Sequence, residues 1–161
     1  MPSEDRVNQN APDADIAARV RAAVGALLEV DALLFRVDAN ERSLTHRLAL
    51  HLTAAFPGWD VDCEYNRKGF DQKKIIHELG GEGEPNSTNG SRVFPDIIVH
   101  HRTKPENLLV IEVKKSTSDR SDDADLHKLQ LLRAQLGYTH ALFLRLVCGV
   151  ETPAIEKAVW C

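Results

Sequence analysis

Two neighbouring apolar segments of the chain contain charged residues at positions where buried strands normally have none. Asp96 follows Pro95 near the start of the first segment, and Glu112 and Lys114 lie inside the second. An unpaired carboxylate in such a strand costs several kcal/mol. Two carboxylates and an ammonium group at one end of a sheet suit a hard cation, because Mg²⁺ takes a few carboxylate oxygens and keeps waters and open positions. The residues therefore predict metal-assisted attack of water on a phosphate.

The spacing of these residues predicts that they meet. Side chains alternate along a strand, so Glu112 and Lys114 share one face and Ile111 and Val113 the other. Fifteen residues separate Asp96 from Glu112, and a hairpin of that length can bring the two carboxylates together. The alternative is an exposed cross-strand ion pair worth about 1 kcal/mol. It is less favoured, because residues 108–113 are apolar on both faces apart from Glu112.

The elements that must position these residues follow from hydrophobic periodicity. Residues 1–13 are polar and predict a disordered tail, and residues 14–161 predict a single domain. Residues 67–91 are rich in glycine and charge and predict a long loop. Residues 108–147 read as strand, helix and parallel strand, typical of an α/β domain on a mixed sheet. The expected helices cover residues 16–35, 40–56 and 123–136, although Gly25 and Asp31 disfavour one unbroken helix over the first range. The expected strands cover residues 59–66, 93–101, 108–115, 140–147 and 155–160.

Pro95-Asp96 with Glu112-Val113-Lys114 resembles the active-site signature of the PD-(D/E)XK nuclease superfamily, and the resemblance extends over roughly residues 40–147. It implies a restriction-endonuclease-like αβββαβ core with a mixed central sheet flanked by helices, here with an extra N-terminal helix. It implies that Asp96 and Glu112 hold Mg²⁺ or Mn²⁺ and that Lys114 positions or activates the attacking water. The expected activity is that of a metal-dependent nuclease acting on DNA, an endonuclease rather than an exonuclease.

The resemblance also points to Glu41 as a glutamate that supports the metal through a water. Helical spacing places Glu41 within the apolar stripe of Leu44, Leu48 and Leu52, and so toward the core. Residues 38–41 also resemble a capping box, in which Glu41 would reach back to the first amide of its helix. Both interpretations remain open at this point.

Other cations and amides are candidates for substrate binding. Arg67, Lys68 and Arg92 flank the predicted loop and could form a basic rim for phosphates, although each also fits an ordinary solvated charge run. Lys128 and Gln130 lie early in the predicted helix 123–136 and could face a phosphate. A solvated helix flank is the favoured interpretation for these two residues.

Composition and charge bear on the cellular compartment and on the partners of the protein. The formal charge of −4 weakens any case for broad nucleic-acid coating, but it permits a narrow metal-assisted site. The polar N-terminus, the lack of long apolar runs and only three cysteines predict a cytoplasmic protein without a membrane partner. The expected partners are DNA and either a second copy or a partner subunit, since cutting two strands usually needs two sites. The alternative function is a non-catalytic nucleic-acid- or protein-binding module that keeps the nuclease fold.

Overall fold

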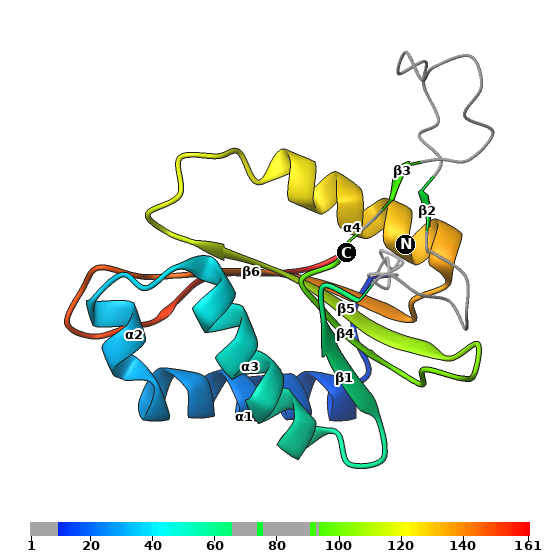
Figure 1. Cartoon of the computed structure of the whole chain (residues 1–161), viewed down its shortest axis with the longest axis horizontal. Helices are drawn as coiled ribbons and strands as arrows, with labels where there is room; N and C mark the ends of the chain where they lie inside the picture. The colour runs from blue at the N-terminus through cyan, green and yellow to red at the C-terminus, as the bar shows by residue number, and fades with distance from the viewer. Residues whose placement is uncertain (1–9, 66–73, 76–90, 93) are drawn as a thin grey trace, which may run out of the picture.

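The central element is a five-stranded mixed sheet (Figure 1). The computed structural model describes residues 10–65, 74–75, 91–92 and 94–161. The sheet runs in the order β1-β4-β5-β6-β7, in which β5 and β6 are parallel and the other neighbours antiparallel. The predicted α/β class with a mixed sheet is therefore confirmed. The strands are β1 (Asp60–Cys63), β4 (Ile97–His100), β5 (Asn107–Lys115), β6 (His140–Leu146) and β7 (Ile155–Trp160).

Helices cover both faces of the sheet. α1 (Ala14–Val30), α2 (Ala32–Arg36) and α3 (Glu41–Ala55) lie on one face, and α4 (Asp123–Leu136) lies on the other (Figure 1). α4 has the bounds predicted for it, and it ends at Gly137, whose φ of 70° is the left-handed conformation that glycine adopts readily. α4 connects β5 to β6, and the two strands pair side by side in parallel.

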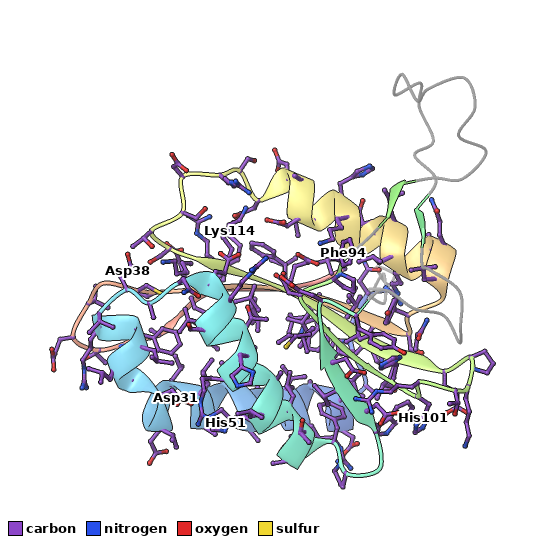
Figure 2. The ribbon with its side chains drawn as sticks, viewed as in Figure 1. Asp31, Asp38, His51, Phe94, His101 and Lys114 are labelled. Carbon is purple, nitrogen blue, oxygen red and sulfur yellow. The ribbon has the colours of Figure 1, made fainter. Side chains whose placement is uncertain are left out.

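The helical pattern over residues 16–35 forms two helices, and the structure breaks it at Asp31, one of the two residues that disfavour an unbroken helix. The Asp31 carboxylate accepts a hydrogen bond from Arg47 Nε at 2.9 Å and pairs with His51 Nε2 at 2.7 Å. Figure 2 shows Asp31 and His51 facing each other. Both partners come from α3, so the break serves a contact between helices that local periodicity does not contain.

The predicted loop over residues 67–91 is partly structured. β2 (Lys74–Ile75) and β3 (Ser91–Arg92) pair as a short antiparallel sheet. The remaining residues between 66 and 93 lie outside the described residues, as do residues 1–9 of the predicted tail. Asn10, the first described residue, accepts a hydrogen bond from Arg133 Nη1 of α4 at 3.0 Å.

Alternation along β5 determines which side chains reach each layer. Leu109, Ile111 and Val113 join the core packed against α1 and α3, whereas Val110 joins the core under α4. Glu112 and Lys114 therefore point to the α4 face, as the period of two requires. Within the described part of the chain, no helix combines the length and apolarity needed to cross a membrane.

Replacement of Leu48 by alanine should lower the free energy of unfolding by about 2–5 kcal/mol, because its fully buried side chain would leave a cavity between α3 and the sheet. Leu50→Ala on the same helix is the matched control, since that leucine is 45% exposed and should change stability much less. Urea unfolding followed by circular dichroism measures both variants. Equal losses would mean that this helix face is not the main packing face.

Candidate active site

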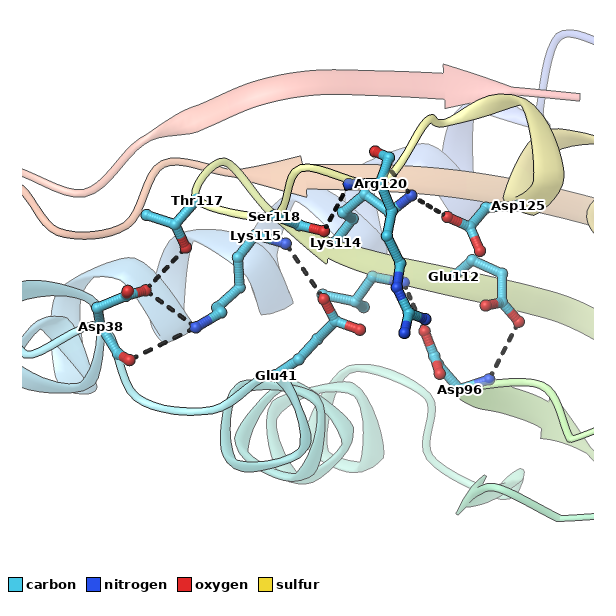
Figure 3. A pocket seen from close by; sticks show the side chains of 11 residues that line it. Asp38, Glu41, Asp96, Glu112, Lys114, Lys115, Thr117, Ser118, Arg120 and Asp125 are labelled. Atoms are coloured by element: carbon cyan, nitrogen blue, oxygen red, sulfur yellow. Dashed lines mark hydrogen bonds and ion pairs between the residues drawn. The ribbon is translucent and has the colours of Figure 1, made fainter.

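A cleft of about 530 Å³ opens at the carboxyl end of β5, where the loop after this strand meets the starts of α3, β4 and α4 (Figure 3). Its lining is strongly charged. It consists of Asp38, Glu41, Asp96, Glu112, Val113, Lys114, Lys115, Thr117, Ser118, Arg120 and Asp125. The residues singled out from the two apolar segments thus share one cleft with charged residues from three other segments.

Asp96 and Glu112 lie side by side through the register of β4 and β5. Ile97 pairs with Ile111, so the residue before β4 falls beside Glu112. The Asp96 N–H donates to Glu112 Oε1 at 3.3 Å, and the Val113 N–H donates to Asp96 Oδ2 at 2.8 Å. Asp96 immediately precedes β4 instead of lying inside it as expected. This position leaves its carboxylate at the cleft, where the chain has not yet entered the sheet.

Both carboxyl groups are held above their ordinary pKa values. Burial, and after it the Asp96 charge, raises the pKa of Glu112 to about 8 against the opposing effect of Lys128. Burial also raises the pKa of Asp96, against the hydrogen bond from the Val113 amide. Paired, buried carboxyls with raised pKa values are typical of sites that await a cation or perform acid–base chemistry.

Lys114 is buried on the α4 face and held at several points. Its Nζ lies 2.5 Å from Asp125 Oδ2 and donates to the carbonyl oxygen of Ser121 at 2.8 Å. Its side chain is only 7% exposed. The strand places the ammonium group in the cleft wall, and the first turn of α4 fixes its position. This arrangement suits a group that orients a bound molecule and does not itself move.

Glu41 faces the cleft, which decides between the two interpretations of this residue. The cap of α3 is Asn40, whose side-chain oxygen accepts a hydrogen bond from the Ser43 amide at 2.9 Å. Glu41 Oε2 instead accepts a hydrogen bond from the Lys115 amide at 3.4 Å. Burial, then the charge of Asp96, raises the pKa of Glu41. The capping-box interpretation is therefore wrong, and the carboxyl groups of Glu41 and Asp96 line the same cleft.

Of the predicted substrate-binding residues, the structure brings Lys128 to the carboxyl groups of the site but not Gln130. Lys128 is not the solvated flank that was favoured, because its Nζ lies 2.8 Å from Glu112 Oε1 and donates to the Phe94 carbonyl at 2.9 Å. Gln130 is exposed on α4 and does not line the cleft. Arg67 and Lys68 lie outside the described residues, and for Arg92 only the backbone is described, as part of β3.

Several residues that line the cleft were not predicted from the sequence. From its place in the first turn of α4, Asp125 resembles a carboxylate that favours a helix start, yet it pairs with Lys114. Lys115 reaches the opposite side of the cleft, where its Nζ binds Asp38 Oδ1 at 3.0 Å. This contact, with a hydrogen bond from Thr117, holds the pKa of Asp38 below its usual range. The available signal was the need of each buried lysine for a carboxylate partner.

The charge balance of the cleft fits a divalent cation. Five carboxyl groups line it against three cationic side chains, and three of those carboxyls have raised pKa values. Within the described ranges, no three His, Cys, Asp or Glu side chains converge closely enough to hold a metal alone. A cation held by Asp96 and Glu112 would thus complete its coordination with water, which Mg²⁺ commonly retains. The donor set is carboxylate oxygen, the preference of Mg²⁺ and Mn²⁺.

Comparison with known proteins adds no family to this description. No protein-family model, no curated protein and no solved structure matches the chain. The interpretation of the cleft therefore depends on its own residues: two interlocked carboxyl groups, a third beside them and a fixed ammonium group.

Proposed function

We propose that the chain is a metal-dependent nuclease that hydrolyses phosphodiester bonds in DNA at this cleft. The observation that carries the proposal is the interlocking of Asp96 and Glu112, sixteen positions apart, beside the buried Lys114. Burying ionisable groups in an apolar strand costs stability, and a fold retains such groups most readily where they perform chemistry.

Each residue has a distinct role in the proposed reaction. Asp96 and Glu112 would hold Mg²⁺ or Mn²⁺, which when bound would lower the pKa of a water and offset charge on the phosphate. Lys114 donates hydrogen bonds that orient the attacking water toward phosphorus. Glu41 would support the metal through a water. Hydrolysis adds the hydroxyl of water to phosphorus, breaks one P–O ester bond and leaves the proton on the departing oxygen.

The proposal extends to the fold family. The sequence α3–β1–β4–β5–α4–β6, with a parallel β5–β6 pair, is the order expected for a restriction-endonuclease-like αβββαβ core. α1 and α2 are then additions before this core, and β7 is an added edge strand. The position of Asp96 before one strand and of Glu112 and Lys114 within the next supports this assignment.

The cysteines and the proposed reaction indicate where the enzyme acts and with which partners. All three cysteines are free thiols, as expected of a protein kept in a reducing compartment such as the cytoplasm. An endonuclease that cuts both strands of DNA needs two active sites, so we propose that it acts as a homodimer or with a partner subunit.

One observation favours a second candidate, a binding module without catalysis. Lys114 and Lys128 already neutralise Asp125 and Glu112 within the protein. A domain that kept the fold but not the chemistry would retain such ion pairs. This candidate predicts weak Mn²⁺ binding and no cleavage.

Nicking of supercoiled plasmid with Mn²⁺ tests the proposal. The unmodified protein should nick plasmid with Mn²⁺ and not with EDTA, and Asp96→Asn should lower the rate by about 10²-fold or more, since a carboxylate ligand is lost. Asp119→Asn, at an exposed position outside the cleft lining, is the matched control and should cut normally. Tight Mn²⁺ binding without cleavage of DNA or RNA would contradict the nuclease, and weak Mn²⁺ binding would favour the binding module.

A further inference from the structure

A second hollow, of about 240 Å³, adjoins the cleft and shares two of its walls, Glu41 and Asp96. The rest of its lining comes from the first turns of α3 and from the end of β1, namely Arg42, Thr45, His46, Cys63 and Glu64. Because the two spaces meet at the carboxylates, a chain-like ligand whose phosphate lies at Asp96 would continue into the hollow. The proposed reaction does not use this space.

The rim of the hollow carries a cation, Arg42, that can exchange its present ion-pair partner for a ligand. The Arg42 side chain is 86% exposed, and its Nε lies 3.4 Å from Oε1 of the half-exposed Glu64. Exposed ion pairs contribute only about 0–1 kcal/mol, so a phosphate could replace Glu64 at little cost. A guanidinium group also matches two phosphate oxygens at once. Glu64 is held in place by its N–H bond to the Asp96 carbonyl at 3.1 Å, with a left-handed φ of 48°.

The floor of the hollow is neutral. Thr45 is buried, and Cys63 Sγ lies 4.0 Å from its carbonyl oxygen. Partial burial and the nearby Asp62 charge raise the pKa of the Cys63 thiol, so it carries no charge near pH 7. His46 stands one turn beyond Arg42 on α3 and is exposed. An uncharged floor with an imidazole at its edge suits a flat nucleobase, which stacks on such rings.

We propose that this hollow binds the nucleotide next to the scissile phosphate of a DNA strand. Arg42 contacts the phosphate of that nucleotide, and its base lies over Thr45 and Cys63 beside His46. The inference rests on the proposed nuclease function and adds a substrate-binding subsite to it. The carboxylate-rich cleft repels phosphates other than the one held at the metal, so the attraction for the adjoining phosphate must come from a cation outside it.

Alkylation of Cys63 reports on occupancy of the hollow without measuring cleavage. Cys63 is exposed, whereas Cys148 and Cys161 are buried and act as internal references. In a Lys114→Met variant with Mn²⁺, which should hold the metal without cutting, a DNA oligonucleotide at about ten times its Kd should slow iodoacetamide labelling of Cys63 about tenfold, following its occupancy. Polyphosphate, which has no bases, should protect Cys63 much less. Labelling at an unchanged rate while the DNA is bound overturns the subsite.

Arg42→Ala provides the second measurement, with Arg21→Ala on the exposed side of α1 as its charge-matched control. Arg42→Ala should reduce the slope of log Kd against log salt by about 0.7–0.9, the value of one lost phosphate contact. It should raise KM for DNA more than it raises KM for bis(p-nitrophenyl) phosphate, which has no neighbouring nucleotide. Equal slopes for the two variants overturn the subsite alone. Failure of the unmodified protein to cut either substrate overturns the nuclease proposal, and the subsite with it.

Discussion

Glu112→Gln should reduce DNA cleavage by roughly 10³-fold, because loss of a metal ligand removes several kcal/mol of transition-state stabilisation. The same variant should be more stable than the unmodified protein at pH 8 in the absence of metal. Both effects have one cause. The Glu112 carboxyl is buried beside Asp96, so its charged form is useful to the reaction but costly to the fold.

The pH dependence gives this prediction its sign. The pKa of Glu112 rises from an ordinary 4.5 to about 8 in the folded protein. The stabilising contribution of the protonated carboxyl is therefore fully present below pH 4.5 and is lost as pH rises through 8, by at most roughly 5 kcal/mol. Glutamine remains neutral, so the two proteins should be similar at pH 4.5, and the variant should gain relative stability toward pH 8.

Urea unfolding in EDTA at several pH values measures the stability difference. Glu29→Gln, at an exposed position of α1, is the matched control and should change neither stability nor cleavage. Mn²⁺ should raise the Tm of the unmodified protein at pH 8 and have little effect on Glu112→Gln. Normal cleavage by Glu112→Gln would place the chemistry elsewhere. Lower stability of this variant at pH 8 would mean that the ion pair with Lys128 outweighs the cost of burial.

The order of elements could be predicted because local patterns determine it. The helix over residues 123–136 and the strand over residues 155–160 were found with the predicted bounds, since periodicity and Gly137 mark their limits without help from distant residues. Asp31 disfavours an unbroken helix over residues 16–35, but the contact that holds Asp31 at the break could not be predicted from local patterns. It depends on Arg47 and His51 of another helix, which become neighbours only once the chain has folded.

In the candidate site, too, the residues placed by strand pattern could be predicted, and the residues contributed by another element could not. Strand alternation places Glu112 and Lys114 on one face, and the register across β4 and β5 brings Asp96 to them. The counter-ions were misjudged because they come from another element. Asp125 and Lys128, three residues apart on α4, face Lys114 and Glu112, yet from the sequence they resembled a helix-start carboxylate and a solvated lysine. Two opposite charges buried in one strand face should have suggested two complementary charges in the helix that covers it.

Lys114→Met should abolish most cleavage and leave Mn²⁺ binding intact. The cation paired with Glu112 is Lys128, whereas the Lys114 ammonium contacts Asp125 and the Ser121 carbonyl. Its removal therefore takes away the group that orients the attacking water without removing a metal ligand. The loss of a positioned donor of this kind lowers kcat by about 10²–10³-fold. Methionine preserves the alkyl stem, so the packing of β5 against α4 should be retained.

Rates of plasmid nicking and calorimetric titration of Mn²⁺ into the same preparations separate these effects. Lys104→Met, at an exposed turn between β4 and β5, is the matched control and should behave as the unmodified protein does. Because Lys114→Met leaves Asp125 without its partner, the double variant with Asp125→Asn distinguishes unfolding from lost chemistry: it should recover any lost stability and remain inactive. If the double variant instead recovers cleavage, Lys114 serves only to neutralise Asp125, and the water must be oriented by another group in the cleft.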